Sequence, residues 1–330
     1  MIQSTHTVRQ NNQSLVLQKV ISNDEISRIE LSNQLNLNKV SVSEIVRQLL
    51  DDNIIIESRY GDSSGQGGRR PILLKLNKNL HSVLCVNIIK PFVEFSLYRI
   101  DGKLIHHSRD KMIFDPKEDF LNDFLTKLIG YAKYDTSTLS GTVALSIAIH
   151  GVTKNNQIIF TPFDYMDEID LEQVIKRHLN LPVYINNEAN LSALAEYTFS
   201  TSNESLINVN VGIGVGAGII SNSELLIGDD GYIGEIGHSI LFPDGRPCPC
   251  GNNGCLDQYA SNSSLERTIG KSYSDLSELT HDWNNDENIR GILNQQAAHL
   301  GIAINNIISF YNPELVVINS PYYQIIPDLK

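Results

Sequence analysis

Four side chains in the C-terminal half of the chain limit how that half can fold. Three of the chain's four cysteines, Cys248, Cys250 and Cys255, fall within eight residues, and His238 lies ten residues before the first of them. Three thiolates and one imidazole make a four-ligand set that suits a closed tetrahedral Zn²⁺ site. The alternative is a disulfide between two of the cysteines, but an odd number of clustered cysteines argues against it. We therefore expect a loop held by zinc, with glycines and prolines supplying its turns.

Two acidic residues flank these ligands. Glu235 lies three residues before His238, and Asp257 lies two residues after Cys255. A loop that fixes the zinc ligands would also fix these carboxylates beside the imidazole. Sugars need convergent arrays of this kind, because each hydroxyl both donates and accepts hydrogen bonds. Taken alone, the pattern is explained equally well by two solvated loop acids.

Length and composition bound the class of protein. With 330 residues the chain is long enough for two or three domains with cores of their own. A hydrophobic content of 41% and a charged content of 19% are those of an ordinary soluble globular protein. No apolar run approaches the roughly 20 residues of a membrane span, and the first residues do not resemble a signal peptide. We therefore expect a cytoplasmic protein with reduced thiols and no membrane partner.

The formal net charge of −12 is unevenly distributed. Residues 1–80 carry ten Lys/Arg and eight Asp/Glu, whereas the rest of the chain carries sixteen and thirty. Because nucleic acid attracts positive charge and repels negative charge, this split predicts an N-terminal nucleic-acid-binding module on an acidic body.

Residues 15–50 show the pattern of a helix-turn-helix. After a first amphipathic helix, Ser27 and Glu30 form a capping-box pattern at the start of a short second helix. A tight turn then leads into a third helix, which starts at Asn38 or Lys39 and has apolar residues at helical spacing.

Small polar and basic residues of the third helix are the candidates for DNA contact. They are Lys39, Ser41, Ser43 and Arg47. Lysine and serine suit contacts to phosphates or base edges, and arginine suits a phosphate or a guanine. The alternative is a small structural helical domain whose basic residues are solvated.

A strand–loop–strand pattern follows the three helices. Residues 54–56 and 71–76 predict two strands joined by a glycine-rich loop. With the helices, this hairpin makes a winged helix-turn-helix domain over residues 1–80. Arg69 and Arg70, at the base of the wing, would reach the DNA backbone or the minor groove. The alternative is two solvated arginines on a loose hairpin.

From residue 81 the pattern becomes that of an α/β fold with a mixed sheet. The expected strands cover 82–87, 92–98, 142–149, 181–185, 206–211 and 315–318, with helices over 117–133, 191–199 and much of 265–308. Asn187 and Glu188 follow one of these strands, and open α/β sheets bind ligands at the carboxyl ends of their strands. A helix cap at Asn186 or Asn187 is compatible with that role. The stretch 212–218 predicts a glycine-rich turn but lacks the Lys-Ser/Thr of a P-loop.

Together these motifs resemble the ROK family of repressors and sugar kinases, and within it the xylose-repressor type. The resemblance covers nearly the whole chain. Its motifs are the winged helix, Gly67-Gly68-Arg69-Arg70-Pro71, Asn187-Glu188-Ala189-Asn190, the glycine turn, Glu235-x-x-His238 and Cys248-x-Cys250-x4-Cys255. It implies a two-lobed actin-like (ribonuclease-H-like) ATPase fold over residues 81–330, with a sugar in the cleft.

The resemblance also implies which residues hold the sugar. They are Asn187, Glu188, Glu235, His238 and Asp257. The family usually has a glutamate at the last of these positions, so Asp257 is a departure. The histidine also binds zinc in this family, so metal and sugar would share one side chain.

Other departures separate this chain from the kinases of the family. The kinases carry an aspartate as general base where this chain has Glu188, and a base misplaced by about 1 Å can cost about 100-fold in rate. Asn87 to Pro91 stands where the kinases have an Asp-x-Gly-Gly-Thr phosphate turn, and Ile213 replaces a phosphate-binding hydroxyl. We therefore expect a sugar cleft beside a nucleotide site that does not hold MgATP well.

These inferences predict a sugar-responsive repressor without enzymatic activity, acting on xylose-utilisation genes. Its homodimer would bind a palindromic operator and release it when a sugar, xylose in the first instance, binds the cleft. The alternatives are an active sugar kinase with an accessory DNA-binding head and a non-inducible, truncated DNA-binding protein. Family repressors usually continue well past residue 318, so we expect the C-terminal part of the second lobe to be missing here.

Overall fold

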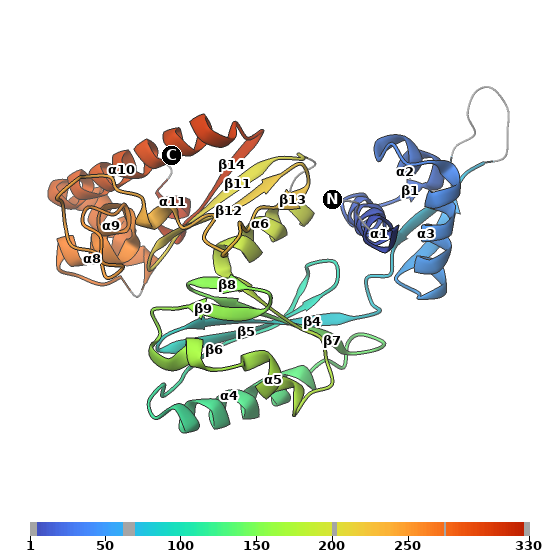
Figure 1. The fold of residues 1–330 in the computed structure, drawn as a ribbon, viewed down its shortest axis with the longest axis horizontal. Helices are drawn as coiled ribbons and strands as arrows, with labels where there is room; N and C mark the ends of the chain where they lie inside the picture. The colour runs from blue at the N-terminus through green and yellow to red at the C-terminus, as the bar shows by residue number, and fades with distance from the viewer. Residues whose placement is uncertain (1–4, 62–69, 200–202, 274, 327–330) are drawn as a thin grey trace. The chain divides into compact units, whose positions relative to one another are not determined.

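A computed structural model describes residues 5–61, 70–199, 203–273 and 275–326 (Figure 1). The chain forms two compact units. The first unit runs to Asn186 and includes a short return at Thr198–Thr201. The second unit comprises Asn187–Tyr197 and the residues from Ser202 onward.

The N-terminal part of the first unit is built from three helices and a small antiparallel sheet with the order β1-β3-β2. Its elements are α1 (Thr5–Ile21), β1 (Ile26–Ser27), α2 (Arg28–Gln34), α3 (Lys39–Asp51), β2 (Ile55–Tyr60) and β3 (Ile72–Leu76). The predicted capping box is confirmed, because Glu30 N–H donates to Ser27 Oγ (3.2 Å) and Ser27 N–H donates to Glu30 Oε2 (2.8 Å). Asn38 caps α3 with its side chain alone, since Asn38 Oδ1 accepts a hydrogen bond from Ser41 N–H (2.8 Å). The helices share a core that includes Leu31 and Val46.

The rest of the first unit is a mixed sheet with the order β10-β7-β4-β5-β6. Its strands are β4 (Ser82–Ile89), β5 (Phe92–Arg99), β6 (Leu104–Lys111), β7 (Thr142–Ile149) and β10 (Val183–Asn187), beside a hairpin of β8 (Val152–Lys154) and β9 (Gln157–Phe160). The helical segments are α4 (Lys117–Ala132), η1 (Asp164–Glu168) and α5 (Leu171–Lys176). The apolar face of α4, with Phe120, Phe124 and Leu128, shares one buried core with the strands.

The second unit is also a mixed sheet, with the order β13-β12-β11-β14, in which β11 is antiparallel to β12 and parallel to β14. Its strands are β11 (Leu206–Val211), β12 (Val215–Ser221), β13 (Glu224–Leu225) and β14 (Leu315–Asn319). Its helical segments are α6 (Glu188–Phe199), η2 (Ile236–His238), α7 (Asp257–Ala260), α8 (Asn262–Ile269), α9 (Leu276–Asn285), α10 (Glu287–Tyr311) and α11 (Pro321–Ile325).

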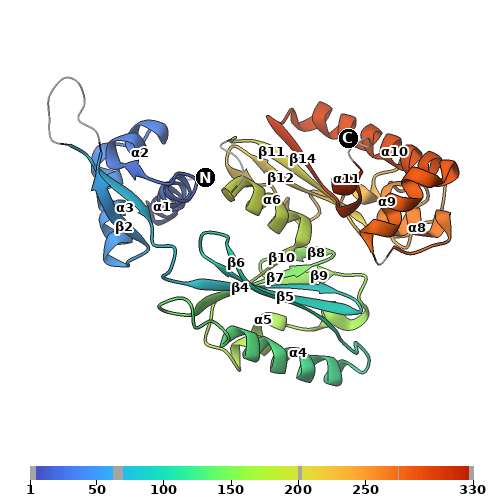
Figure 2. The ribbon, with the colours of Figure 1, turned by 180° about the vertical axis from the view of Figure 1, so that it is seen from behind.

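Alternation along β11 explains how the helices cover this sheet. Ile207 and Val209 pack in one core with residues of α10, whereas Leu206 packs in another with Ala193 of α6. Successive side chains of a strand point to opposite faces, so α10 and α6 lie on opposite faces of the sheet (Figure 2). The predicted α/β class with mixed sheets is confirmed.

Two expectations for the second unit need correction. The stretch 212–218 is a turn only over 212–214, because β12 starts at Val215. Helix α6 begins at Glu188 instead of Leu191, because Asn187 Oδ1 accepts hydrogen bonds from Ala189 N–H (2.8 Å) and Asn190 N–H (3.3 Å) and so caps the helix.

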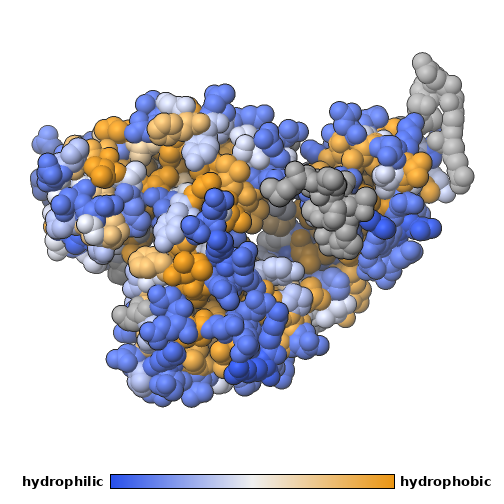
Figure 3. Space-filling model, in the orientation of Figure 1, coloured by the Kyte–Doolittle hydropathy of each residue, from blue (hydrophilic) through white to orange (hydrophobic). Residues whose placement is uncertain are grey.

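None of the described helices combines the length and the apolar character needed to cross a bilayer. In the space-filling view, hydrophilic residues are spread among apolar ones over the visible face (Figure 3).

Candidate metal and sugar site

The four predicted metal ligands converge within the second unit. The ligand atoms of His238, Cys248, Cys250 and Cys255 all lie within 4.8 Å of one another. Nδ1 of His238 is 3.7 Å from Sγ of Cys248, and the Sγ atoms of Cys250 and Cys255 are 3.6 Å apart. A regular tetrahedron with Zn–S of about 2.3 Å and Zn–N of about 2.0 Å places two sulfurs about 3.8 Å apart, and sulfur and nitrogen about 3.5 Å apart. The spacing therefore fits a tetrahedral ion, and the three thiols are free instead of paired in a disulfide.

Backbone turns bring these ligands together. Cys248 N–H donates to Asn252 O (2.8 Å) and Gly251 N–H donates to Cys248 O (3.0 Å), which closes the loop between Cys248 and Cys250. Gly251 and Gly254 have φ of +95° and +75°. At Gly254 a Cβ would also lie 1.6 Å from Phe242 O, so only glycine fits there. The predicted glycine turns are therefore present at both positions.

The thiols themselves favour a cation. Burial first, and then hydrogen bonds and charge from Cys250 and Cys248, raise the pKa of Cys255 to about 12. Three thiolates this close repel one another, and a bound cation offsets that repulsion. The donor set thus suits Zn²⁺, which would be held by all four side chains.

The turn that carries Glu235 and His238 packs directly on β12. Ala217 N–H donates to Gly234 O (2.8 Å), and a Cβ on Gly234 would lie 1.9 Å from Ala217 O. A Cβ on Gly237 would lie 2.2 Å from Oδ1 of Asp257. Because Gly234 and Gly237 have no side chains, the turn can lie this close to β12 and Asp257. The sequence analysis missed this positioning role.

Asp257 anchors the other side of this turn. Its Oδ1 accepts a hydrogen bond from Val215 N–H (2.7 Å). Burial raises the pKa of Asp257, while the Val215 hydrogen bond and the nearby His238 act in the opposite direction. The carboxyl group is thus fixed at the start of β12, next to the 212–214 turn.

Electrostatic coupling shows that the predicted sugar ligands lie near one another. Burial raises the pKa of Glu188 to about 7, with a further contribution from the charge of Asp257. Burial also raises the pKa of Glu235; the charge of Glu188 adds to this effect and His238 opposes it. The structure therefore brings Glu188, Glu235, His238 and Asp257 together, and Asn187 adjoins them at the start of α6. A carboxyl group such as Glu188, whose pKa is about 7, can both donate and accept hydrogen bonds near neutral pH, as sugar hydroxyls require.

His238 faces the two halves of the site with its two ring nitrogens. Nδ1 points toward Cys248, whereas Nε2 is 4.0 Å from Oε2 of Glu235. A metal on Nδ1 leaves the ring proton on Nε2 and so fixes one tautomer. The ring would then present a donor to Glu235 and to any ligand hydroxyl beside it.

The DNA-contact candidates are distributed over α3 and the wing. Lys39, Ser43 and Arg47 are exposed, whereas Ser41 is half-buried. Arg70 is exposed immediately before Pro71, and Arg69 lies outside the described residues.

A further exposed side chain of α3 was missed by the sequence analysis. Val40 is 71% exposed at the first turn of the helix. It falls outside the apolar stripe of Val42, Ile45, Val46 and Leu49, and that mismatch is the signal that would have found it.

The structure also shows the contacts of positions at which the sequence analysis found differences from ROK kinases. Ile213 is 49% exposed at the tip of the turn between β11 and β12, which is closed by Gly212 N–H donating to Gly214 O (2.9 Å). Asn87, at the start of the stretch that replaces the phosphate turn, donates from Nδ2 to Glu94 Oε2 (3.4 Å).

Comparison with known proteins places the chain in a family. The model of the ROK family matches residues 93–321. The xylose repressor of Bacillus spizizenii is 32% identical over 324 residues, which is 95% of this chain and 83% of that repressor. The xylose repressor of Bacillus subtilis is 30% identical, with coverage of 95% and 83%.

Solved structures share the fold. A crystal structure of a ROK family transcriptional regulator, a homolog of the Escherichia coli Mlc protein, superposes with a TM-score of 0.79 at 24% identity and covers 98% of this chain and 86% of that one. A ROK family glucokinase from Streptomyces griseus, in complex with glucose and AMPPNP, has a TM-score of 0.65 at 19% identity and covers 75% and 86%. The predicted actin-like sugar-kinase fold is thus confirmed. From the matched family model and the identity to the xylose repressors, this chain belongs to the ROK family.

Proposed function

We propose that this chain is a sugar-responsive transcriptional repressor that binds operator DNA through its N-terminal winged helix-turn-helix, residues 1–80, and releases it when a sugar binds the second unit. The observation that carries the proposal is a polar array in the second unit, formed by Glu188, Glu235, His238 and Asp257, beside a cluster of four potential metal ligands. The names of the relatives, xylose repressors at about a third identity, support both repression and xylose as the first sugar to test.

The sugar would be held by side chains whose geometry the protein sets before the sugar arrives. Carboxyl groups of Glu188, Glu235 and Asp257 accept from sugar hydroxyls, and Nε2–H of His238 donates to one. Asn187, whose Oδ1 caps α6, adds an amide at the edge of the array. Zn²⁺ on His238, Cys248, Cys250 and Cys255 would hold both the tautomer and the position of the histidine.

The DNA-binding surface would centre on α3. Lys39 and Arg47 supply positive charge for phosphates or guanine, and Ser41 and Ser43 supply hydroxyls. The exposed methyl groups of Val40 suit the methyl group of a thymine in the major groove. Arg70, with Arg69 beside it in the sequence, would extend the contact from the wing. A homodimer places two such heads on a palindromic operator.

Release requires that the sugar prefer one conformation of the protein over another. A ligand shifts an equilibrium only by the difference between its affinities for the two states. The conformation that binds sugar best would therefore bind operator less well.

Phosphoryl transfer is not expected of this chain. Asn87 to Pro91 stands where the kinases of the family place their first phosphate turn, and Ile213 stands where they place a phosphate-binding hydroxyl. The kinase alternative is supported by neither repressor relative named above.

Two experiments test the proposed function. Selection of bound sequences from a random DNA pool should give a two-fold symmetric site, and ATP turnover should not rise when xylose or glucose is added. Recovery of no preferred sequence, or sugar-dependent ATP turnover that Glu188→Gln abolishes, would make the proposal wrong.

A further inference from the structure

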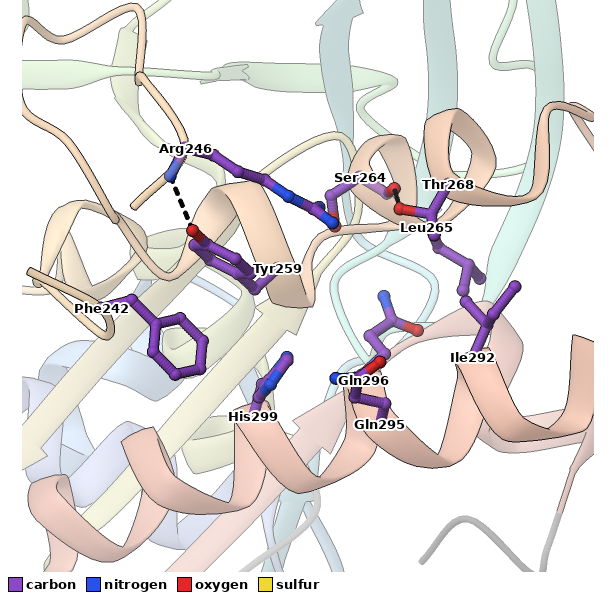
Figure 4. Close-up of a pocket in the computed structure, with 10 residues that line it drawn as sticks. All are labelled: Phe242, Arg246, Tyr259, Ser264, Leu265, Thr268, Ile292, Gln295, Gln296 and His299. Carbon is purple, nitrogen blue, oxygen red and sulfur yellow. Dashed lines mark hydrogen bonds between the residues drawn. The ribbon is translucent and has the colours of Figure 1, made fainter. Parts of the chain in front are cut away.

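A cavity of about 300 Å³ lies in the second unit and uses none of the predicted sugar or metal ligands. Side chains from the 242–246 loop, α7, α8 and α10 surround it (Figure 4). Its size is at the lower end of the range for small-molecule sites, about 300–1,000 Å³.

Three rings form one side of the cavity. The ring centroids of Phe242 and Tyr259 are 4.8 Å apart, and His299 lies 5.2 Å from the first and 5.7 Å from the second, all edge to face. The guanidinium carbon of Arg246 lies 4.8 Å from the centroid of Tyr259. A ligand therefore meets apolar ring surface beside a positive charge.

Two buried polar atoms of the cavity wall have no hydrogen-bond partner among the described residues. Gln296 is 3% exposed, and its Nε2 donates to the carbonyl oxygens of Ala260 and Ser261, both at 2.9 Å. Its Oε1 is buried without a hydrogen-bond partner among the described residues. Leaving a buried acceptor unpaired costs folding free energy, so such an atom calls for a ligand, a water or another donor.

His299 supplies the second buried polar atom, Nδ1, which has no partner in the part of the chain that the structure describes. Burial lowers the pKa of His299, so the ring is neutral at physiological pH. A neutral imidazole has one donor and one acceptor nitrogen, so Nδ1 can accept a hydrogen bond from a ligand when the proton is on Nε2.

We propose that this cavity is a second ligand site, separate from the sugar array, for a small polyhydroxylated carboxylate, that is, a sugar acid. Hydroxyl groups of such a ligand would donate to Gln296 Oε1 and His299 Nδ1, and its C–H face would lie on the rings. Its carboxylate would pair with Arg246, which has five N–H donors, one of them on Nη1 donating to Gln258 O (2.7 Å). One guanidinium beside a neutral histidine matches a single negative charge, so a carboxylate fits better than a phosphate dianion.

Isothermal titration with xylonate and gluconate tests the site in the 330-residue, zinc-loaded chain. Both sugar acids should still bind Glu235→Ala, which removes a predicted ligand of the inducing sugar. A failure of the second site is therefore distinguishable from a failure of the proposed function. Arg246→Ala should weaken both acids about 10- to 100-fold, the usual effect of losing a hydrogen bond to a charged group. Thr268→Trp, which places a large ring at the exposed edge of the cavity, should prevent binding.

Arg267→Ala is the matched control, because Arg267 is also an exposed arginine that bonds Gln258, through Oε1 (3.1 Å), but does not line the cavity. Its affinity for the acids should equal that of the wild type. Absence of binding at millimolar concentration would overturn the proposal. Equal weakening by Arg246→Ala and Arg267→Ala, or binding of inorganic phosphate as tight as that of the acids, would also overturn it.

Discussion

One added methyl group tests whether the η2 turn positions the predicted sugar ligands. In Gly237→Ala the new Cβ would lie 2.2 Å from Oδ1 of Asp257 and 2.3 Å from the carbonyl oxygen of Val215. Ordinary contacts begin near 3.4 Å, and Val215 is held in a strand, so the turn must move by about 1 Å. Overpacking of this kind costs about 1–3 kcal/mol of folding free energy. The shift moves Glu235 and His238 away from the other carboxyl groups.

The expected consequence is a selective loss of sugar binding. Losing one hydrogen bond to a charged group corresponds to about 10- to 100-fold in affinity. Isothermal titration should show this loss for xylose, or for the best sugar from a thermal-shift panel, while anisotropy shows unchanged operator affinity. The control is Gly291→Ala on α10, where nothing lies within 4 Å of the new Cβ and a helical alanine adds up to about 1 kcal/mol of stability. Sugar affinity in Gly237→Ala equal to that of the wild type would refute the role given to this turn.

Three further predictions concern the metal, the DNA and pH. Elemental analysis should find one Zn²⁺ per chain, and Cys250→Ser should lose it because a tetrahedral set needs all four ligands; unchanged zinc content in the variant would contradict the assignment. Arg47→Ala should cost about 1–3 kcal/mol and relax sequence preference if Arg47 reads a base, or weaken all sequences and reduce the salt slope by about one if it contacts phosphate; wild-type binding that does not respond to salt would contradict both. Because the pKa of Glu188 is raised to about 7, the folded chain holds a proton that the unfolded chain releases above about 4.5, so the free energy of unfolding should fall as pH rises between these values. Glu188→Gln should remove up to about 3 kcal/mol of this fall in denaturant titrations, and identical pH profiles for the two proteins would count against a buried, protonated Glu188.

Elements with local signals were predictable from the sequence. The start of α2 follows from Ser27 and Glu30, whose hydrogen bonds span three residues, and Asn38 marks the start of α3 for the same reason. The cluster of potential metal ligands was equally predictable, since three of its residues lie within eight positions and their chemistry is distinctive.

Features that depend on long-range packing were not predictable. Helix α1 starts at Thr5, ten residues before the expected apolar pattern. Its first turns were missed because they are polar in sequence and show no hydrophobic period. The close approach of Gly237 to Asp257 joins residues twenty positions apart, and no local pattern announces it. The cavity beside Gln296 and His299 depends likewise on α10 packing against a loop more than forty residues earlier.

The antagonism between sugar and operator is tested most directly by titrating sugar into the operator complex, for the wild type and for Glu235→Ala. The wild type should release operator as xylose saturates, and operator should weaken xylose binding by the same factor, as linkage requires. Glu235→Ala should bind operator with wild-type affinity and retain it at every sugar concentration. Operator affinity of the wild type that stays unchanged at saturating concentrations of every pentose and hexose would contradict a sugar-responsive repressor.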